Sequence, residues 1–201
     1  MSRFGAGAVA ATLTRPGRRA HVSILRDYGI VIAFVTLFVY LSIDSDVFLT
    51  KDNLVNLAFQ AAPIGIMACG GALVFIAGGF DLSVGAVASF SAVIAGKAFV
   101  GAGVPVWWSF VLGALTGLGF GVGNGLLVTV ARVNAFIATL ASSIIVYGIA
   151  IAVTGGFLIT VDSTRWSTLG TEKAWGTINY PIFVWIAFAL FCGFQIGRAH
   201  V

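Results

Sequence analysis

Long apolar runs separated by short polar linkers are the feature that most restricts what this chain can fold into. An α-helix needs about 20 predominantly apolar residues to cross the hydrocarbon core of a bilayer. Only 9% of the 201 residues are charged, whereas soluble domains have about a quarter. The sequence therefore predicts an all-α, polytopic transmembrane helix bundle with about six spans. The runs cover approximately residues 28–43, 54–78, 84–100, 106–130, 135–155 and 181–196.

The positions of the cations predict the orientation of these spans. Four arginines stand close before the first run: Arg15, Arg18, Arg19 and Arg26. Lys and Arg are enriched in cytoplasmic segments of membrane proteins, so residues 1–27 are expected to form a basic cytoplasmic flank. Alternate crossing then puts Arg132 inside and Asp44 outside. Because the cations follow this pattern, the net charge of +4 indicates no nucleic-acid partner.

The run at 106–130 contains four glycines at intervals of four residues. Such small-xxx-small faces let helix backbones approach closely in lipid. The sequence therefore predicts one packing face without side chains on this span. The pattern is not a dinucleotide-binding fingerprint, because no strand precedes it and it lies inside a span. The four positions are Gly113, Gly117, Gly121 and Gly125.

The linker "GGFDLS", from Gly78 to Ser83, sets one acid between two apolar runs. The carboxylate of Asp81, or the hydroxyl of Ser83, is expected to cap the free N–H groups that open the next helix. Gly78 and Gly79 would end the preceding helix with positive φ. An acid at a membrane boundary can also line a polar pathway or contact a partner. Capping is the favoured role, and the two roles are compatible.

Amide side chains inside apolar runs are further candidates for a polar pathway. Gln60 lies in the run 54–78, and Asn124 lies beside the glycines of 106–130, where it is expected to hydrogen-bond across helices. Asn134 is expected to cap the helix that follows it. Because polar groups are costly in lipid, they should face protein or water. The candidate pathway or structural residues are Gln60, Asp81, Ser83 and Asn124.

The sequence contains no pattern typical of catalysis, and we predict no catalytic, metal-binding or cofactor-binding residues. His21 and His200 have no partner at metal-ligand spacing. A phosphate-binding loop requires a glycine where the chain has Ser91, and Ser or Thr where it has Ala98. Energy for any transport must then come from a partner chain or a gradient. A membrane-embedded enzyme is disfavoured because no polar groups cluster at one depth, and a passive channel remains an alternative.

Two motifs carry a resemblance to a known family. "GGFDLSVGAVASFSAVIAG" and "GNGLLVTVARVNAFIATLASSIIVYGIAIAVTGG" resemble sequences in ABC-transporter permeases of the ribose and monosaccharide uptake type. This resemblance implies a sugar importer in a bacterial inner membrane, hydrolysing ATP only on partner chains. The implied partners are a second permease subunit, cytoplasmic ATP-binding subunits, and a periplasmic or lipid-anchored sugar-binding protein. Permeases of the same superfamily for branched-chain amino acids or another small solute are the alternative.

The end of the chain departs from this family. Family members have more spans and continue past the sixth through a cytoplasmic stretch that contacts the ATPase. Here the sequence stops at "GFQIGRAHV", and "IGRAHV" matches the translation of a common sequencing adapter. We therefore expect a partial permease domain at 28–196 and a non-native tail at 197–201, and a real stop after a short tail is the alternative.

Overall fold

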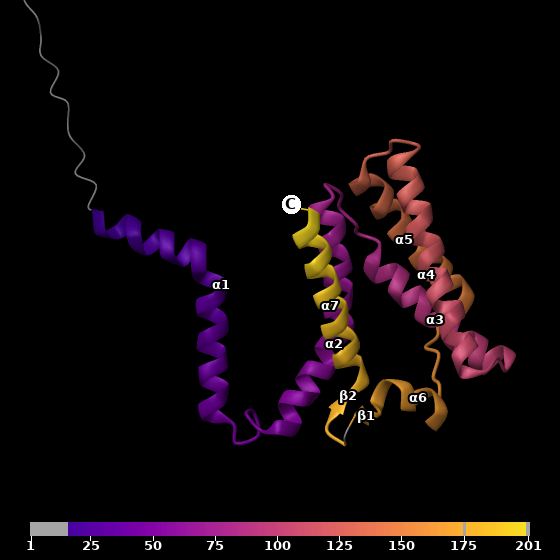
Figure 1. The fold of residues 1–201 in the computed structure, drawn as a ribbon, viewed down its shortest axis with the longest axis horizontal. Helices are drawn as coiled ribbons and strands as arrows, with labels where there is room; N and C mark the ends of the chain where they lie inside the picture. The colour runs from indigo at the N-terminus through magenta and orange to yellow at the C-terminus, as the bar shows by residue number, and fades with distance from the viewer. Residues whose placement is uncertain (1–15, 175, 200–201) are drawn as a thin grey trace, which may run out of the picture. The chain divides into compact units, whose positions relative to one another are not determined.

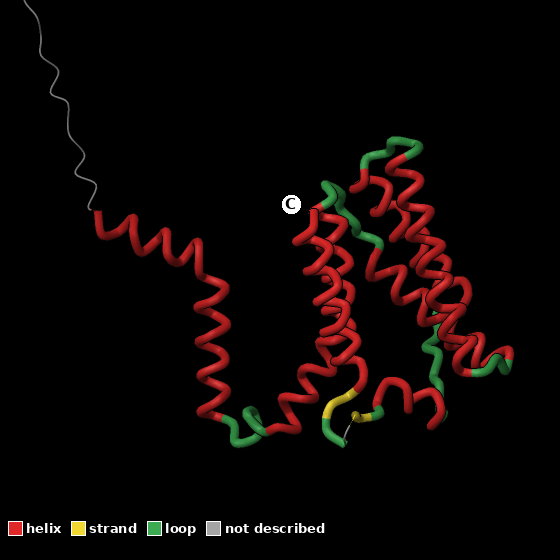
Figure 2. The backbone as a smooth tube through the Cα atoms, in the orientation of Figure 1, coloured by secondary structure: helices red, strands yellow, loops and turns green. Residues whose placement is uncertain are grey.

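The computed structural model describes residues 16–174 and 176–199, and the chain divides into two units between Leu54 and Val55. The described residues form seven helices and one short hairpin (Figures 1 and 2). The helices are α1 (Pro16–Asp44), α2 (Lys51–Ile76), α3 (Val84–Ala102), α4 (Val106–Thr129), α5 (Ala135–Thr154), α6 (Thr164–Thr171) and α7 (Tyr180–Ala199). The strands are β1 (Lys173–Ala174) and β2 (Ile178–Asn179).

The first unit contains α1, a short turn and the start of α2. The rings of Phe38 and Phe48 meet edge to face with centroids 5.3 Å apart. The Asn53 side-chain amide donates to the carbonyl of Phe48 over 2.8 Å. The Thr50 hydroxyl accepts the backbone N–H of Asn53 over 3.4 Å. These contacts join the turn to α1 on one side and to α2 on the other.

The core of the second unit is the packing of α3, α4 and α5 against one another. Its buried apolar side chains are small near the helix crossings, with Ala95 on α3 and Ala138 and Val146 on α5. Small side chains allow close approach of the backbones, which is how helices associate in lipid. Phe90 and Phe120 add an edge-to-face ring contact between α3 and α4, with centroids 5.9 Å apart.

The five expected spans after the first are confirmed as long apolar helices: α2, α3, α4, α5 and α7. Their boundaries agree with the sequence expectation to within about three residues. The apolar part of α1, Tyr28–Asp44, is helical but shorter than these five. Gly103 and Gly155 end α3 and α5 with φ of 65° and 66°, a left-handed conformation that glycine adopts without strain.

The segment between α5 and α7 contains a helix and a hairpin, although its sequence predicts only a linker. It forms α6 and an antiparallel hairpin in which Lys173 pairs with Asn179 and Ala174 with Ile178. Figure 1 shows α6 and the hairpin at the end of α7 where that helix begins. This segment is short and of mixed polarity, so the hydropathy pattern that identified the spans gave no indication of it.

Candidate functional site

The linker between α2 and α3 is held by Asp81. Its Oδ1 accepts the backbone N–H of Ser83 over 2.7 Å and the hydroxyl of Ser83 over 2.6 Å. Neither expected cap reaches the free N–H groups of α3: the carboxylate holds the N–H of Ser83, the residue before the helix, and the Ser83 side chain makes no capping bond. The expectation of two positive-φ glycines is correct for Gly78, at 81°, and wrong for Gly79. One left-handed residue is sufficient to end α2.

A chain of hydrogen bonds continues from Asp81 through three helices. Asn124 on α4 donates its Nδ2 to the hydroxyl oxygen of Ser83 over 2.8 Å, and Ser142 on α5 donates its hydroxyl to Asn124 Oδ1. The directions are fixed chemically. A carboxylate oxygen only accepts, so Ser83 spends its single proton on Asp81 and must accept from the Asn124 amide nitrogen. Asn124 and Ser83 are both buried, and the expected interhelical bond is present.

Thr139 on α5 ties the same linker to the bundle. Its Oγ1 accepts the backbone N–H of Leu82 over 3.1 Å. Its hydroxyl proton can reach the carbonyl of Ala135, at 2.8 Å, or of Phe80, at 3.1 Å. Because buried backbone groups need partners, this one side chain fixes the linker between its two glycines and α3. Asn134 caps α5 as expected, accepting the N–H of Phe136 over 3.0 Å.

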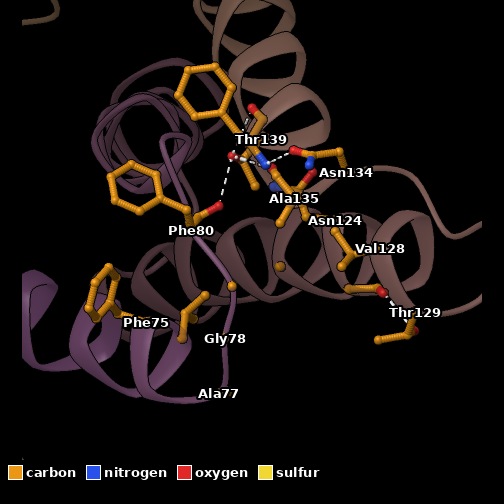
Figure 3. A pocket seen from close by; sticks show the side chains of 15 residues that line it. Phe75, Ala77, Gly78, Phe80, Asn124, Val128, Thr129, Asn134, Ala135 and Thr139 are labelled. Carbon is orange, nitrogen blue, oxygen red and sulfur yellow. Dashed lines mark hydrogen bonds between the residues drawn. The ribbon is translucent and has the colours of Figure 1, made fainter.

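Asn124, Asn134 and Thr139 line a cavity of about 700 Å³ (Figure 3). It lies between the end of α2, the linker, the second half of α4 and the start of α5. Its wall is mainly apolar, with Phe75, Phe80 and Phe136 contributing rings. Among the described residues, no three His, Cys, Asp or Glu side chains gather where they could hold a metal ion. The mainly apolar wall suits packing or binding of an apolar group.

Two of the four glycines of α4 lie close to α3, and the other two lie in open space. A Cβ at Gly113 would lie 2.8 Å from the carbonyl oxygen of Ser91, and one at Gly117 would lie 3.2 Å from the Ser91 hydroxyl. A Cβ at Gly121 or Gly125 would meet nothing within 4 Å, and both glycines line the cavity. Within the described chain, only Gly113 and Gly117 therefore pack closely against α3, and a packing role for Gly121 and Gly125 stays a prediction. Each step of four residues turns about 40° around a helix, so the row rotates away from α3.

Gln60 is not brought together with the other polar candidates. Its side chain is exposed on α2. Sixteen residues of helix separate it from Ile76, which is about 24 Å along the axis. The site thus contains Asp81, Ser83 and Asn124 but not Gln60.

The sequence does not reveal the partner of Ser142, because a lone serine in an apolar run gives no indication of what it contacts. Nor does it reveal the role of Lys97, whose ammonium donates to the Val153 carbonyl over 2.6 Å. That carbonyl lies in the last turn of α5, where a cation is favoured by the helix dipole. A single lysine near the end of an apolar run was the available signal.

Three relatives illustrate what the chain is similar to. It is 34% identical over 170 residues to the L-arabinose ABC transporter permease protein AraH of Azospirillum brasilense, covering 85% of this chain and 50% of that protein. It is 35% identical over 150 residues to the ribose import permease protein RbsC of Bacillus subtilis, covering 74% and 46%. It is 31% identical over 182 residues to RbsC of Escherichia coli strain K12, covering 87% and 55%. The chain spans about half the length of these relatives.

No solved structure matches the chain. The family model described as branched-chain amino acid transport system / permease component matches residues 53–195. That stretch begins in α2, ends in α7 and contains the whole Asp81–Ser83–Asn124–Ser142 network. This chain therefore belongs to the branched-chain amino acid transport system / permease component family.

Proposed function

We propose that this chain provides membrane-spanning helices of an ABC importer for a monosaccharide. The observation that carries the proposal is its similarity to permeases named for L-arabinose and ribose over most of its length. The five long apolar helices agree with a permease. ATP hydrolysis then takes place on separate cytoplasmic subunits. A second permease subunit and a periplasmic or lipid-anchored sugar-binding protein complete the importer.

We place the N-terminus and the Asp81 linker on the cytoplasmic side of a bacterial inner membrane. The α2–α3 linker and the start of α5 share one end of the bundle, because Thr139 bonds to Leu82. The α3–α4 linker and α6 share the opposite end, where they line one cavity. This is the alternation that sequential crossing requires. With the arginine-rich flank inside, Arg132 is also inside, in agreement with the positive-inside bias.

In this proposal the α3–α5 block is a rigid wall beside the solute pathway. The Asp81 network holds the cytoplasmic end of that wall, so Asp81, Ser83 and Asn124 have primarily a structural role. Gln60 has a different role. An exposed amide on an apolar helix is unfavourable against lipid, so Gln60 faces the pathway or a helix of a partner subunit.

Uptake into proteoliposomes tests the function. The chain is reconstituted with candidate ATP-binding and solute-binding proteins, and labelled L-arabinose, D-ribose and L-leucine are supplied outside. We expect pentose uptake that requires both internal ATP and the binding protein. Uptake of a pentose without ATP would instead indicate a passive channel.

The second candidate is import of a branched-chain amino acid, which the family description favours. In the same vesicles, ATP-dependent uptake of L-leucine with no uptake of either pentose would establish that function and refute the sugar importer. Vesicles without the ATP-binding subunits are the matched control, since they retain the membrane helices and lack only the energy source.

A further inference from the structure

A second, larger cavity lies at the end of the bundle opposite the Asp81 linker. Its volume is about 1150 Å³, and its two sides are the α3–α4 linker and α6. Unlike the first cavity it has charged and hydroxyl side chains together with an exposed indole. The lining residues are Phe99, Gly103, Val104, Pro105, Val106, Trp107, Ser163, Thr164, Arg165, Thr168 and Glu172.

Helix α6 lines the cavity with polar side chains and packs against α4 with an aromatic one. Thr164, Arg165 and Thr168 line the cavity, followed by Glu172 at the C-cap. Trp166 stacks on Phe110 of α4 with ring centroids 4.7 Å apart and an interplanar angle of 23°, and its ring also lies 5.3 Å from that of Phe99, which lines the cavity. This anchor fixes the rotation of α6 about its axis, so the polar face stays directed at the cavity.

The far end of α6 is also held. The Asn179 side chain donates to the carbonyl of Thr171 over 2.9 Å, and the backbone N–H of Tyr180 donates to the carbonyl of Glu172 over 3.2 Å. These bonds satisfy carbonyls that a helix end otherwise leaves free. A wall fixed at both ends loses little freedom when a ligand binds, which favours affinity.

The two charges on α6 stand where they do not stabilise the helix. Arg165 is in the first turn and Glu172 is at the C-cap, whereas the helix dipole favours anions at the N-terminus and cations at the C-terminus. Within the described part of the chain, neither side chain has a hydrogen bond or ion pair. Trp107 lines the same cavity, is 70% exposed, and has no ring contact with another described residue. The Arg165 guanidinium, the Glu172 carboxylate and the Trp107 ring are therefore all free to contact a ligand in this cavity.

We propose that this cavity binds a monosaccharide. Sugar hydroxyls donate and accept, so they match a guanidinium, a carboxylate and threonine hydroxyls, and the C–H face of a sugar ring can lie on the indole of Trp107. Seven residues separate Arg165 from Glu172, which is about 10 Å along the helix axis. That spread suits hydroxyls distributed around a ring better than the adjacent charged groups of a free amino acid. The choice of a monosaccharide as ligand rests on the proposed function. The new inference is the place on this chain where the sugar binds.

The test uses the whole chain in lipid nanodiscs and ligand-observed saturation-transfer NMR with L-arabinose, D-ribose and L-leucine. Binding of the solute-binding protein to the same nanodiscs is measured as well. Three variants alter the cavity: Trp107→Ala, Arg165→Gln and Glu172→Gln. The matched control is Trp108→Ala, since Trp108 is the neighbouring residue, is 64% exposed and does not line the cavity. All four sites are exposed, so we expect the variants to fold, and circular dichroism checks their helix content.

We expect saturable pentose binding that weakens about tenfold in Arg165→Gln and Glu172→Gln. We expect it to weaken about two- to tenfold in Trp107→Ala and to stay unchanged in Trp108→Ala. Equal loss in the Trp108 control, tighter binding of L-leucine than of either pentose, or binding of the solute-binding protein without free sugar would each overturn the proposal. Absence of pentose binding while the reconstituted importer still takes up pentose would overturn this inference alone. Absence of both would also remove the proposed function.

Discussion

Removing the amide of Asn124 is the most direct test of the network that joins α3, α4 and α5. In Asn124→Ala, Ser83 loses a donor and Ser142 loses its acceptor, because Asn124 serves both. Interhelical hydrogen bonds in membrane proteins contribute about 0.6 kcal/mol on average and about 1.7 kcal/mol at most. Two such bonds predict a loss of about 1–3 kcal/mol in the free energy of unfolding.

The loss is measured by reversible unfolding in mixed micelles, with sodium dodecyl sulfate as denaturant and circular dichroism as readout. Thr129→Ala is the matched control on the same helix. The Thr129 hydroxyl bonds to the carbonyl of Gly125 in its own helix and has no hydrogen bond to any other described element. We expect the control to change the unfolding free energy by less than about 0.5 kcal/mol.

A double-mutant cycle separates the bond to Ser142 from other effects of the substitution. Asn124→Ala and Ser142→Ala are measured singly and together, and the departure from additivity is their coupling energy. We expect a coupling of about 0.6–1.7 kcal/mol. Additive losses, with no coupling within error, would show that the two side chains do not interact in the folded chain. That result would refute the continuous path from Asp81 to α5.

Three further predictions concern single positions in the second unit. Gly113→Ala should lower the unfolding free energy by about 1–3 kcal/mol, because its Cβ would press on the backbone of α3; Gly121→Ala should leave it unchanged or raise it, since that site is open and alanine favours helix. Arg132→Gly should raise it by about 1 kcal/mol, because Arg132 has φ of 55° and left-handed backbone strains residues with a Cβ. Asp81→Ala should lower the amount of folded chain in the membrane more than it changes sugar preference, as judged by membrane yield and competition uptake. Normal yield with altered preference would contradict a structural role for Asp81.

The spans could be predicted from the sequence because length and polarity alone decide whether a helix suits a bilayer. Asn134 is also predictable as a cap, because its side chain bonds a backbone N–H only two residues along the chain. Local chemistry of this kind needs no knowledge of the neighbouring helices. Asp81 belongs to the same class, since the group that it holds is also two residues away.

The partners across helices could not be predicted, because they depend on how each helix is rotated about its axis. An apolar helix surrounded by lipid has no polar face to fix that rotation, and the large side chains on α4 and α5 are exposed on several sides. Ser142 meets Asn124 only in one relative rotation of α5 and α4. The four glycines show the same limitation, since spacing alone did not reveal where the row turns away from α3.

The rotation of the three helices is instead fixed by polar contacts at both ends of the bundle. At one end, Thr139 holds the linker that begins α3, and Asn124 joins that linker to α4 and α5. At the other end, Lys97 of α3 bonds to the last turn of α5. In lipid, apolar side chains gain little by choosing protein over acyl chains. A few polar residues, among them Asp81, Asn124 and Lys97, therefore decide which of many apolar packings this chain adopts.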